Sequence, residues 1–144
     1  MKLYLDTCIW LNVFNKKEQL DEIKESKQLI EKALFNPKLN IYYSGFILKE
    51  LQFKLNTNNF ENKKQFFKKE KLIFIKVLSE DYNLAREFEI ENDFELSFFD
   101  YMHTSICKQN KLILITRDKD LLKFSKTKIN SFSPKELFKR IDFI

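Results

Sequence analysis

Two carboxylates stand just after short apolar runs of this sequence. Asp6 follows Leu3-Tyr4-Leu5 directly, and Asp118 follows the run from Leu112 to Ile115 after two intervening residues. Apolar runs of this length, bounded by polar residues, are typical of strands buried on both faces of a parallel sheet. A carboxylate just past the carboxyl end of such a strand lies where open α/β sheets bind their ligands. The two positions therefore indicate a site at one edge of a sheet.

Two further carboxylates fall in the first turns of predicted helices. Asp100 begins a helix predicted from Phe98 to Lys108, which leads into the strand before Asp118. Glu50 lies in the helix that opens at Ser44-Gly45, after the second predicted strand. Both helices begin at the sheet edge where the strands end, so we expect all four carboxylates to lie at that edge.

Taken singly, each carboxylate has a structural explanation. Asp6 and Asp118 could cap the helices that follow them, Asp100 could complement a helix dipole, and Glu50 could be a solvated charge. Carboxylates that converge repel one another, which raises their pKa values unless a cation compensates. A site of carboxylate oxygens favours Mg²⁺ or Mn²⁺ and suits phosphoryl chemistry, in which the ion neutralises developing charge. Together, the four residues predict such a metal site.

The composition predicts one soluble folded domain. The chain has 144 residues, of which 44% are hydrophobic and 33% charged, so it can bury a sizeable core without a structural metal. Its two cysteines form no CxxC pair, which favours a reduced, cytoplasmic location, and we expect no leader segment and no membrane span. The net charge of +5 is compatible with a polyanionic partner, although AT-rich coding bias would also explain the excess of lysine.

Strands are predicted to alternate with helices along the whole chain. The expected strands are Lys2–Leu5, Ile41–Tyr43, Leu72–Val77, Leu112–Ile115 and Ile129–Phe132. The first expected helices run through Ile9–Phe14, through Glu18–Leu34, and from Ser44-Gly45 to Leu55. A helix then follows a polar loop at Asn56–Asn59 and continues to about Lys69, and the next begins with Ser79 as its cap. The last three run through Phe98–Lys108, through Lys119–Lys123, and from a capping box at Ser133-Pro134-Lys135-Glu136. This alternation predicts an α/β fold with a mainly parallel sheet of about five strands.

At these residues the sequence resembles the PIN-domain ribonucleases, and most closely the small VapC-like toxins. The matching segments are Leu5-Asp6-Thr7, Glu50 after Tyr43-Ser44, Asp100-Tyr101-Met102-His103, Thr116-Arg117-Asp118-Lys119-Asp120 and Ser133-Pro134-Lys135-Glu136-Leu137. The order and approximate separations of these segments match the family, and the resemblance covers essentially the whole chain. The chain departs from the family in having a single glycine, and in carrying Cys8 where Asn or Ser is more common.

The resemblance implies a three-layer α/β/α PIN-like fold, with residues 1–144 as one nuclease domain. It implies a Mg²⁺- or Mn²⁺-dependent endoribonuclease, the toxin of a type II toxin–antitoxin pair, with RNA as substrate, a cognate antitoxin as partner and a homodimer as assembly. The catalytic and metal-binding residues would be Asp6, Glu50, Asp100 and Asp118, with Asp120 as the alternative to Asp118, Thr7 and Thr116 in support and Arg117 on a substrate phosphate. Attack by water would leave a 5′-phosphate.

Other readings remain open. The chain could be an RNA-processing PIN nuclease without a toxin role, or a non-catalytic PIN-like module that binds RNA or protein. A phosphatase would need a second acid where Cys8 stands, and a phospho-receiver would need paired acids before Asp6. We expect His103 to have a supporting or packing role and Cys8 to fill space. The lysine cluster at residues 63–71 favours a solvated face over RNA binding.

Overall fold

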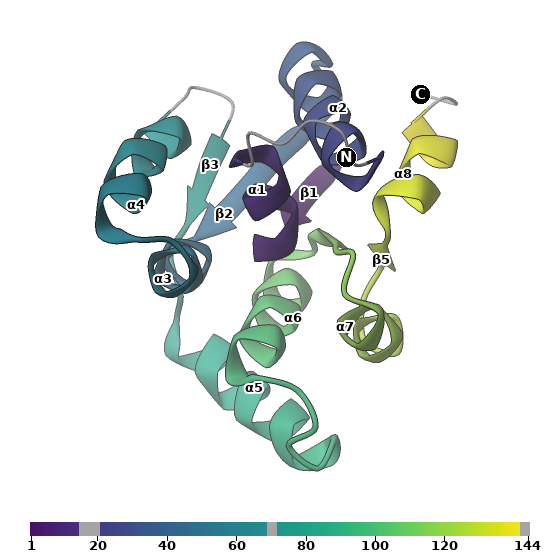
Figure 1. Cartoon of the computed structure of the whole chain (residues 1–144). Helices are drawn as coiled ribbons and strands as arrows, with labels where there is room; N and C mark the ends of the chain where they lie inside the picture. The colour runs from purple at the N-terminus through teal and green to yellow at the C-terminus, as the bar shows by residue number, and fades with distance from the viewer. Residues whose placement is uncertain (15–20, 69–71, 142–144) are drawn as a thin grey trace.

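The structure is a computed structural model that describes residues 1–14, 21–68 and 72–141. Its strands form one parallel sheet in the order β3-β2-β1-β4-β5, with helices packed around it (Figure 1). The strands are β1 (Lys2–Leu5), β2 (Asn40–Ser44), β3 (Leu72–Ile75), β4 (Ile113–Ile115) and β5 (Ser131–Phe132). The helices are α1 (Thr7–Phe14), α2 (Asp21–Phe35), α3 (Gly45–Lys54), α4 (Thr57–Lys64), α5 (Ser79–Glu91), α6 (Phe98–Asn110), α7 (Lys119–Ser125) and α8 (Pro134–Ile141), with a 3-10 helix η1 (Gln65–Lys68).

The strand order places β1 at the centre of the sheet. From β1 the chain crosses to β2 and β3 on one side, and it later adds β4 and β5 on the other. The order therefore reverses next to β1, between it and β4. In open α/β sheets, the crevice at the carboxyl ends of the strands beside such a reversal is where ligands bind. This topology brings residues after β1 and β4 together, as the sequence predicts.

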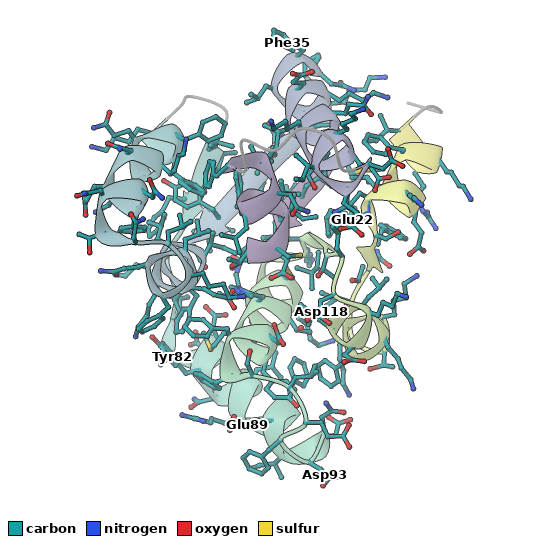
Figure 2. All side chains as sticks on the ribbon, viewed as in Figure 1. Glu22, Phe35, Tyr82, Glu89, Asp93 and Asp118 are labelled. Atoms are coloured by element: carbon teal, nitrogen blue, oxygen red, sulfur yellow. The ribbon has the colours of Figure 1, made fainter. Side chains whose placement is uncertain are left out.

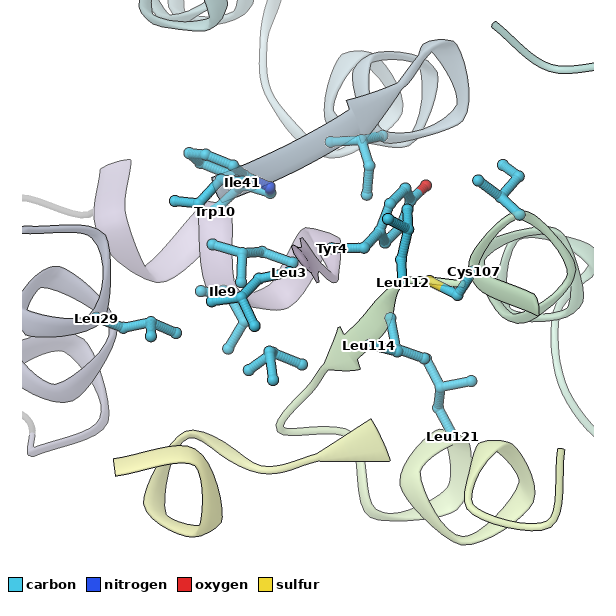
Figure 3. Close-up of a cluster of buried hydrophobic side chains, with 14 of the residues drawn as sticks. Leu3, Tyr4, Ile9, Trp10, Leu29, Ile41, Cys107, Leu112, Leu114 and Leu121 are labelled. Carbon is cyan, nitrogen blue, oxygen red and sulfur yellow. The ribbon is translucent and has the colours of Figure 1, made fainter. Parts of the chain in front are cut away.

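The core is built around the central strand. Leu3, Tyr4 and Leu5 are fully buried, which confirms that the first apolar run is a strand covered on both faces. Trp10 on α1 and Leu114 on β4 are also fully buried, and Figure 3 shows these side chains gathered between the sheet and its helices. Burying a large apolar side chain contributes about 1.5–3 kcal/mol, so the packing fixes where β1 ends.

The predicted elements are present, and their limits differ from the predictions mainly in four ways. The stretch expected to be a polar loop instead begins α4, because the side chain of Asn56 accepts a hydrogen bond from the backbone N–H of Asn59 at 2.8 Å and caps the helix. The helix expected to continue to Lys69 changes to 3-10 geometry after Lys64. Two strands are two residues shorter than predicted, because the third ends at Ile75 rather than Val77 and the last begins at Ser131 rather than Ile129.

The fourth difference concerns the start of α5. Ser79 is the first residue of this helix rather than its cap, and Leu78 occupies the cap position without a side-chain hydrogen bond. The carboxylate of Asp81 instead accepts the backbone N–H of Leu78 at 2.8 Å. The first turn is thus stabilised by an acid two residues inside the helix. Residues 18–20 of one predicted helix, and Lys69 and Lys71 of the lysine cluster, lie outside the described residues.

Caps fix where the helices of the carboxyl edge begin. Ser44 caps α3 by accepting the N–H of Phe46, and Ser97 caps α6 by accepting the N–H of Asp100. At the other end of α6, Lys111 adopts a left-handed conformation, with φ of 56°, which stops the helix and turns the chain into β4. No helix within the described ranges is long and apolar enough to cross a membrane.

Candidate active site

Asp6 lies at the centre of the carboxyl edge, one residue beyond β1. Its backbone N–H donates to the carbonyl of Ile115 at 2.9 Å, which extends the pairing of β1 with β4. Its Oδ1 accepts the N–H of Thr7 at 2.8 Å, and its Oδ2 accepts the hydroxyl of Thr116 at 2.7 Å and the thiol of Cys8 at 3.2 Å. Asp6 is only 5% exposed, and its carboxylate is held in one orientation by groups at the start of α1 and just after β4.

Glu50 comes to the same edge from α3. It is 7% exposed, which excludes the solvated-charge explanation that the sequence allowed. Its Oε1 accepts the hydroxyl of Thr7 at 2.5 Å and lies 3.0 Å from Nε2 of His103, and its Oε2 lies 3.7 Å from Nζ of Lys54. Burial alone would raise the pKa of Glu50, but the bonds from His103 and Thr7 lower it below its usual value. Glu50 is therefore an ionised, buried carboxylate.

A buried chain of hydrogen-bonded polar groups runs from Glu50 into the core and supports it. His103 is fully buried, and its Nδ1 lies 2.8 Å from the hydroxyl of Tyr4, which lies 2.8 Å from the hydroxyl of Ser44. Burial opposes the charged imidazole, but the neighbouring carboxylates, Glu50 first among them, raise the pKa of His103. A protonated His103 then donates from Nε2 to Glu50 and from Nδ1 to Tyr4. Since both ring nitrogens are used, His103 supports Glu50 rather than offering a lone pair to a metal.

The sequence reasoning missed Tyr4 and Ser44 as members of this site. Tyr4 was read only as one apolar residue of a buried strand. A signal was nevertheless present, because a buried tyrosine hydroxyl in an otherwise aliphatic strand requires a hydrogen-bond partner. For Ser44 the sequence indicates the start of a helix and a match to the family before Glu50, but not a contact with Tyr4.

Asp100 reaches the edge from the first turn of α6 and is partly buried. Burial, together with the charges of Asp6, Asp118 and Glu50, raises the pKa of Asp100 to about 7, although the nearby His103 lowers it. The other three predicted acids thus lie close enough to Asp100 for their charges to affect its ionisation.

Asp118 begins α7 at the same edge and lies near the middle of the molecule in Figure 2. Its Oδ1 accepts the N–H groups of Asp120 and Leu121 at 3.0 and 3.2 Å, so the capping explanation is correct for this residue. Its own N–H donates to the hydroxyl of Thr116 at 3.0 Å. Thr116 therefore joins Asp118 to Asp6. The side chain of Asp120 is exposed and lines a hollow on the α5 side of α7, which leaves Asp118 as the preferred candidate.

Cys8 does more than fill space. Besides donating to Asp6, its sulfur accepts the N–H of Arg117 at 3.4 Å. Burial and the charge of Asp6 raise the pKa of Cys8 to about 12, so the group remains a thiol. A thiol thus makes the polar contacts at the position where the chain departs from the usual Asn or Ser.

Arg117 is turned toward α2. Its Nη2 donates to the carbonyl of Glu22 at 2.6 Å and to Oε1 of Glu25 at 2.9 Å, and its Nε donates to Ser26 at 3.2 Å. These contacts tie the loop after β4 to α2. They engage the guanidinium group that the sequence reasoning assigned to a substrate phosphate, so the geometry does not favour that assignment.

The donor set fits a hard divalent cation. Ligand atoms of Asp6, Glu50 and His103 lie within 4.8 Å of one another, and His103 is already engaged through both nitrogens. The carboxylate oxygens of Asp6 and Glu50 remain, with Asp100 and Asp118 interacting electrostatically around them. Burial and the charges of these neighbouring carboxylates both raise the pKa of Asp100, and a bound cation would offset both effects. Chemically, such a cluster can orient water and offset charge on a phosphoryl group.

Comparisons with known proteins agree with this architecture. Solved structures of similar fold include DNA-bound VapBC from Salmonella typhimurium (TM-score 0.70, 13% identity, 93% of this chain and 98% of that chain). They also include VapC20 from Mycobacterium tuberculosis (TM-score 0.68, 17% identity, 88% of this chain and 95% of that chain). A third is VapBC2 from Rickettsia felis (TM-score 0.66, 20% identity, 92% of this chain and 98% of that chain). At these identities the likeness shows the fold. No curated protein sequence matches the chain.

The sequence itself matches a family model. The model of the PIN domain covers residues 3–127, a span that contains all four candidate carboxylates and the five-stranded sheet as far as β4. The parallel sheet, its order and the flanking helices form the three-layer α/β/α arrangement that the sequence reasoning expected. The chain belongs to the PIN-domain family.

Proposed function

We propose that the chain is a Mg²⁺- or Mn²⁺-dependent endoribonuclease, acting through residues 1–144 as a single domain. The observation that carries this proposal is the convergence of Asp6, Glu50, Asp100 and Asp118 at one sheet edge, where burial and the charges of the other three raise the pKa of Asp100 to about 7. Stable folds avoid such crowding, because unpaired buried charges are costly. A nuclease that binds a divalent cation requires such crowded carboxylates, because together they bind the cation.

In this proposal each residue has a separate task. Asp6, Asp100 and Asp118 would hold the ion, and Glu50 would complete the shell or orient the attacking water. The bound ion would supply charge neutralisation at the phosphate and a more acidic water. The hydroxyl of Thr116 bonds both the carboxylate of Asp6 and the backbone N–H of Asp118, which fixes the position of one relative to the other. The hydroxyl of Thr7 orients Glu50 through its contact with Oε1. In-line attack by water on an RNA phosphodiester would leave a 5′-phosphate.

We further propose that the chain is the toxin of a type II pair, with a cognate antitoxin and a homodimeric assembly. Support comes from the solved structures of similar fold: VapC20 is described as a toxin that cleaves the sarcin–ricin loop, and another of them is a toxin–antitoxin complex from Klebsiella pneumoniae. An RNA-processing nuclease of the same fold, without a toxin role, is the alternative. Growth arrest on expression, relieved by a small co-expressed neighbour, would distinguish the two.

The direct test is incubation of the purified protein with structured RNA, with Mn²⁺ or Mg²⁺ and with chelator. We expect metal-dependent cleavage that is lost in Asp6→Asn and in Asp118→Asn. A matched control is Asp93→Asn, the same chemical change at an exposed residue whose left-handed φ of 53° suits asparagine. Cleavage that persists in chelator, or in both site variants, would contradict the proposal and favour a contaminating nuclease or a non-catalytic binding module.

A further inference from the structure

The amino edge of the sheet, opposite the carboxylates, carries an excess of positive charge. Lys2 begins β1, and Lys38 stands two residues before β2. Lys111 likewise stands two residues before β4, and Lys128 stands three before β5. Because parallel strands all begin at the same edge, these residues gather there. The two edges of the sheet therefore have opposite charge.

Lys111 and Lys128, together with three further basic residues, line two neighbouring hollows at this edge. One, of about 340 Å³, is lined by Lys126 and Arg140 and includes Met1. The other, of about 260 Å³, is lined by Lys108, Lys111 and Lys128. The hollows share Ile113, Ile129 and Asn130 in their walls, so they form one groove, which we call the amino-edge groove. None of the described residues that line it is acidic.

Part of this charge is balanced nearby. Lys126 pairs with Glu136 at 2.6 Å, and Lys128 pairs with Glu91 at 2.5 Å. Lysines in the last turn of a helix also complement its dipole, which accounts for some of them. Of the five basic side chains that line the groove, two are in ion pairs, so the groove keeps a net positive charge. Within the described ranges, Lys111 and Arg140 have no carboxylate at salt-bridge distance.

We propose that the amino-edge groove binds the phosphodiester backbone of RNA at a second position, away from the carboxylate centre. The lysines offer point charges, and Arg140, held over the ring of Phe132 at 4.2 Å, offers a planar donor. The central strand β1 has four residues, which span roughly 13 Å between the two edges of the sheet. An RNA must therefore be folded or several nucleotides long to touch both. The inference rests on the proposed function for the identity of the polyanion.

The test is binding of a fluorescent RNA hairpin in chelator, where metal-dependent cleavage cannot occur. We compare Lys111→Asn/Arg140→Gln with Lys64→Gln/Lys68→Gln, which removes the same charge from α4 and η1. Asparagine suits the left-handed conformation of Lys111. Each lost phosphate contact should lower the slope of log affinity against log salt by about 0.7, which is about fivefold in affinity at 0.1 M salt and about 25-fold for the pair.

Equal losses in both double variants, or an unchanged salt slope in the groove variant, would overturn the proposal. The latter result would leave an acidic protein segment as the occupant of the groove. If Lys111→Asn disturbs the end of α6, Lys108→Gln tests the same groove without a backbone requirement. Because binding is measured without metal, failure of the groove and failure of the nuclease chemistry give different results: the first alters affinity, and the second alters cleavage alone.

Discussion

Replacing Asp100 with asparagine should stabilise the metal-free protein at alkaline pH. The pKa of Asp100 is raised from 3.8 to about 7, so its ionisation is penalised in the folded state. Stability from such a group is fully present below pH 3.8, falls as the pH rises, and is lost above about pH 7. A shift of about three units corresponds to at most about 4 kcal/mol, and solvent screening at this partly exposed site reduces it to on the order of 2 kcal/mol. Asparagine keeps the shape and removes the penalty.

The assay is urea unfolding in chelator at pH 8 and at pH 4, for the wild type, Asp100→Asn and Asp93→Asn. We expect Asp100→Asn to exceed the wild type at pH 8 by about 2 kcal/mol and to match it at pH 4. Asp93 lies at the far end of the α5–α6 pair, away from Asp118 (Figure 2), and its variant should follow the wild type at both pH values.

Metal should reverse the order of stability. Mn²⁺ at 100 times its dissociation constant should add about 2.7 kcal/mol to the wild type and little to Asp100→Asn. If Asp100→Asn were less stable than the wild type at pH 8 in chelator, the carboxylates would not be crowded, and the argument for a cation site would fail.

Two more predictions concern the groups that hold the carboxylates. Thr116→Val keeps the shape but removes the hydroxyl between Asp6 and Asp118, so Mn²⁺ affinity measured by calorimetry should fall about 10–100-fold, with Thr116→Ser close to wild type. An equal loss in the serine variant would show that the methyl group, not the hydroxyl, matters. Tyr4→Phe leaves Nδ1 of the buried His103 without its partner and should cost about 1–3 kcal/mol in urea unfolding. No change there would mean that the chain beneath Glu50 is not a stabilising network.

The sequence could predict the four acids because the signals that place them are local. An apolar run that ends in Asp6 or Asp118 marks a strand end, and Asp100 follows a helix cap at Ser97. Parallel topology then requires these positions to share an edge. The state of Glu50 was not predictable in this way, because its burial and low pKa depend on His103, which is 53 residues away in sequence.

Other differences arise where one residue type has two structural uses. Asparagine favours both loops and helix caps, so the stretch after Leu55 was assigned to a loop although Asn56 caps α4. An arginine beside a candidate site can bind substrate or brace the fold, and only the contacts of Arg117 with α2 distinguish the two. Such choices are decided by which partner lies within reach, and spacing along the chain does not contain that information.

The central claim is that Asp6, Glu50, Asp100 and Asp118 together bind one or more divalent ions. Electron paramagnetic resonance measures the free Mn²⁺ that remains at each step of a titration of the metal-free protein, and it tests this claim without any RNA. We expect saturable binding by the wild type and by Asp93→Asn, and a loss of at least tenfold in affinity in Asp6→Asn, whose carboxylate is held by Thr7 and Thr116. Equal binding by the wild type and Asp6→Asn, or none by either, would contradict the claim.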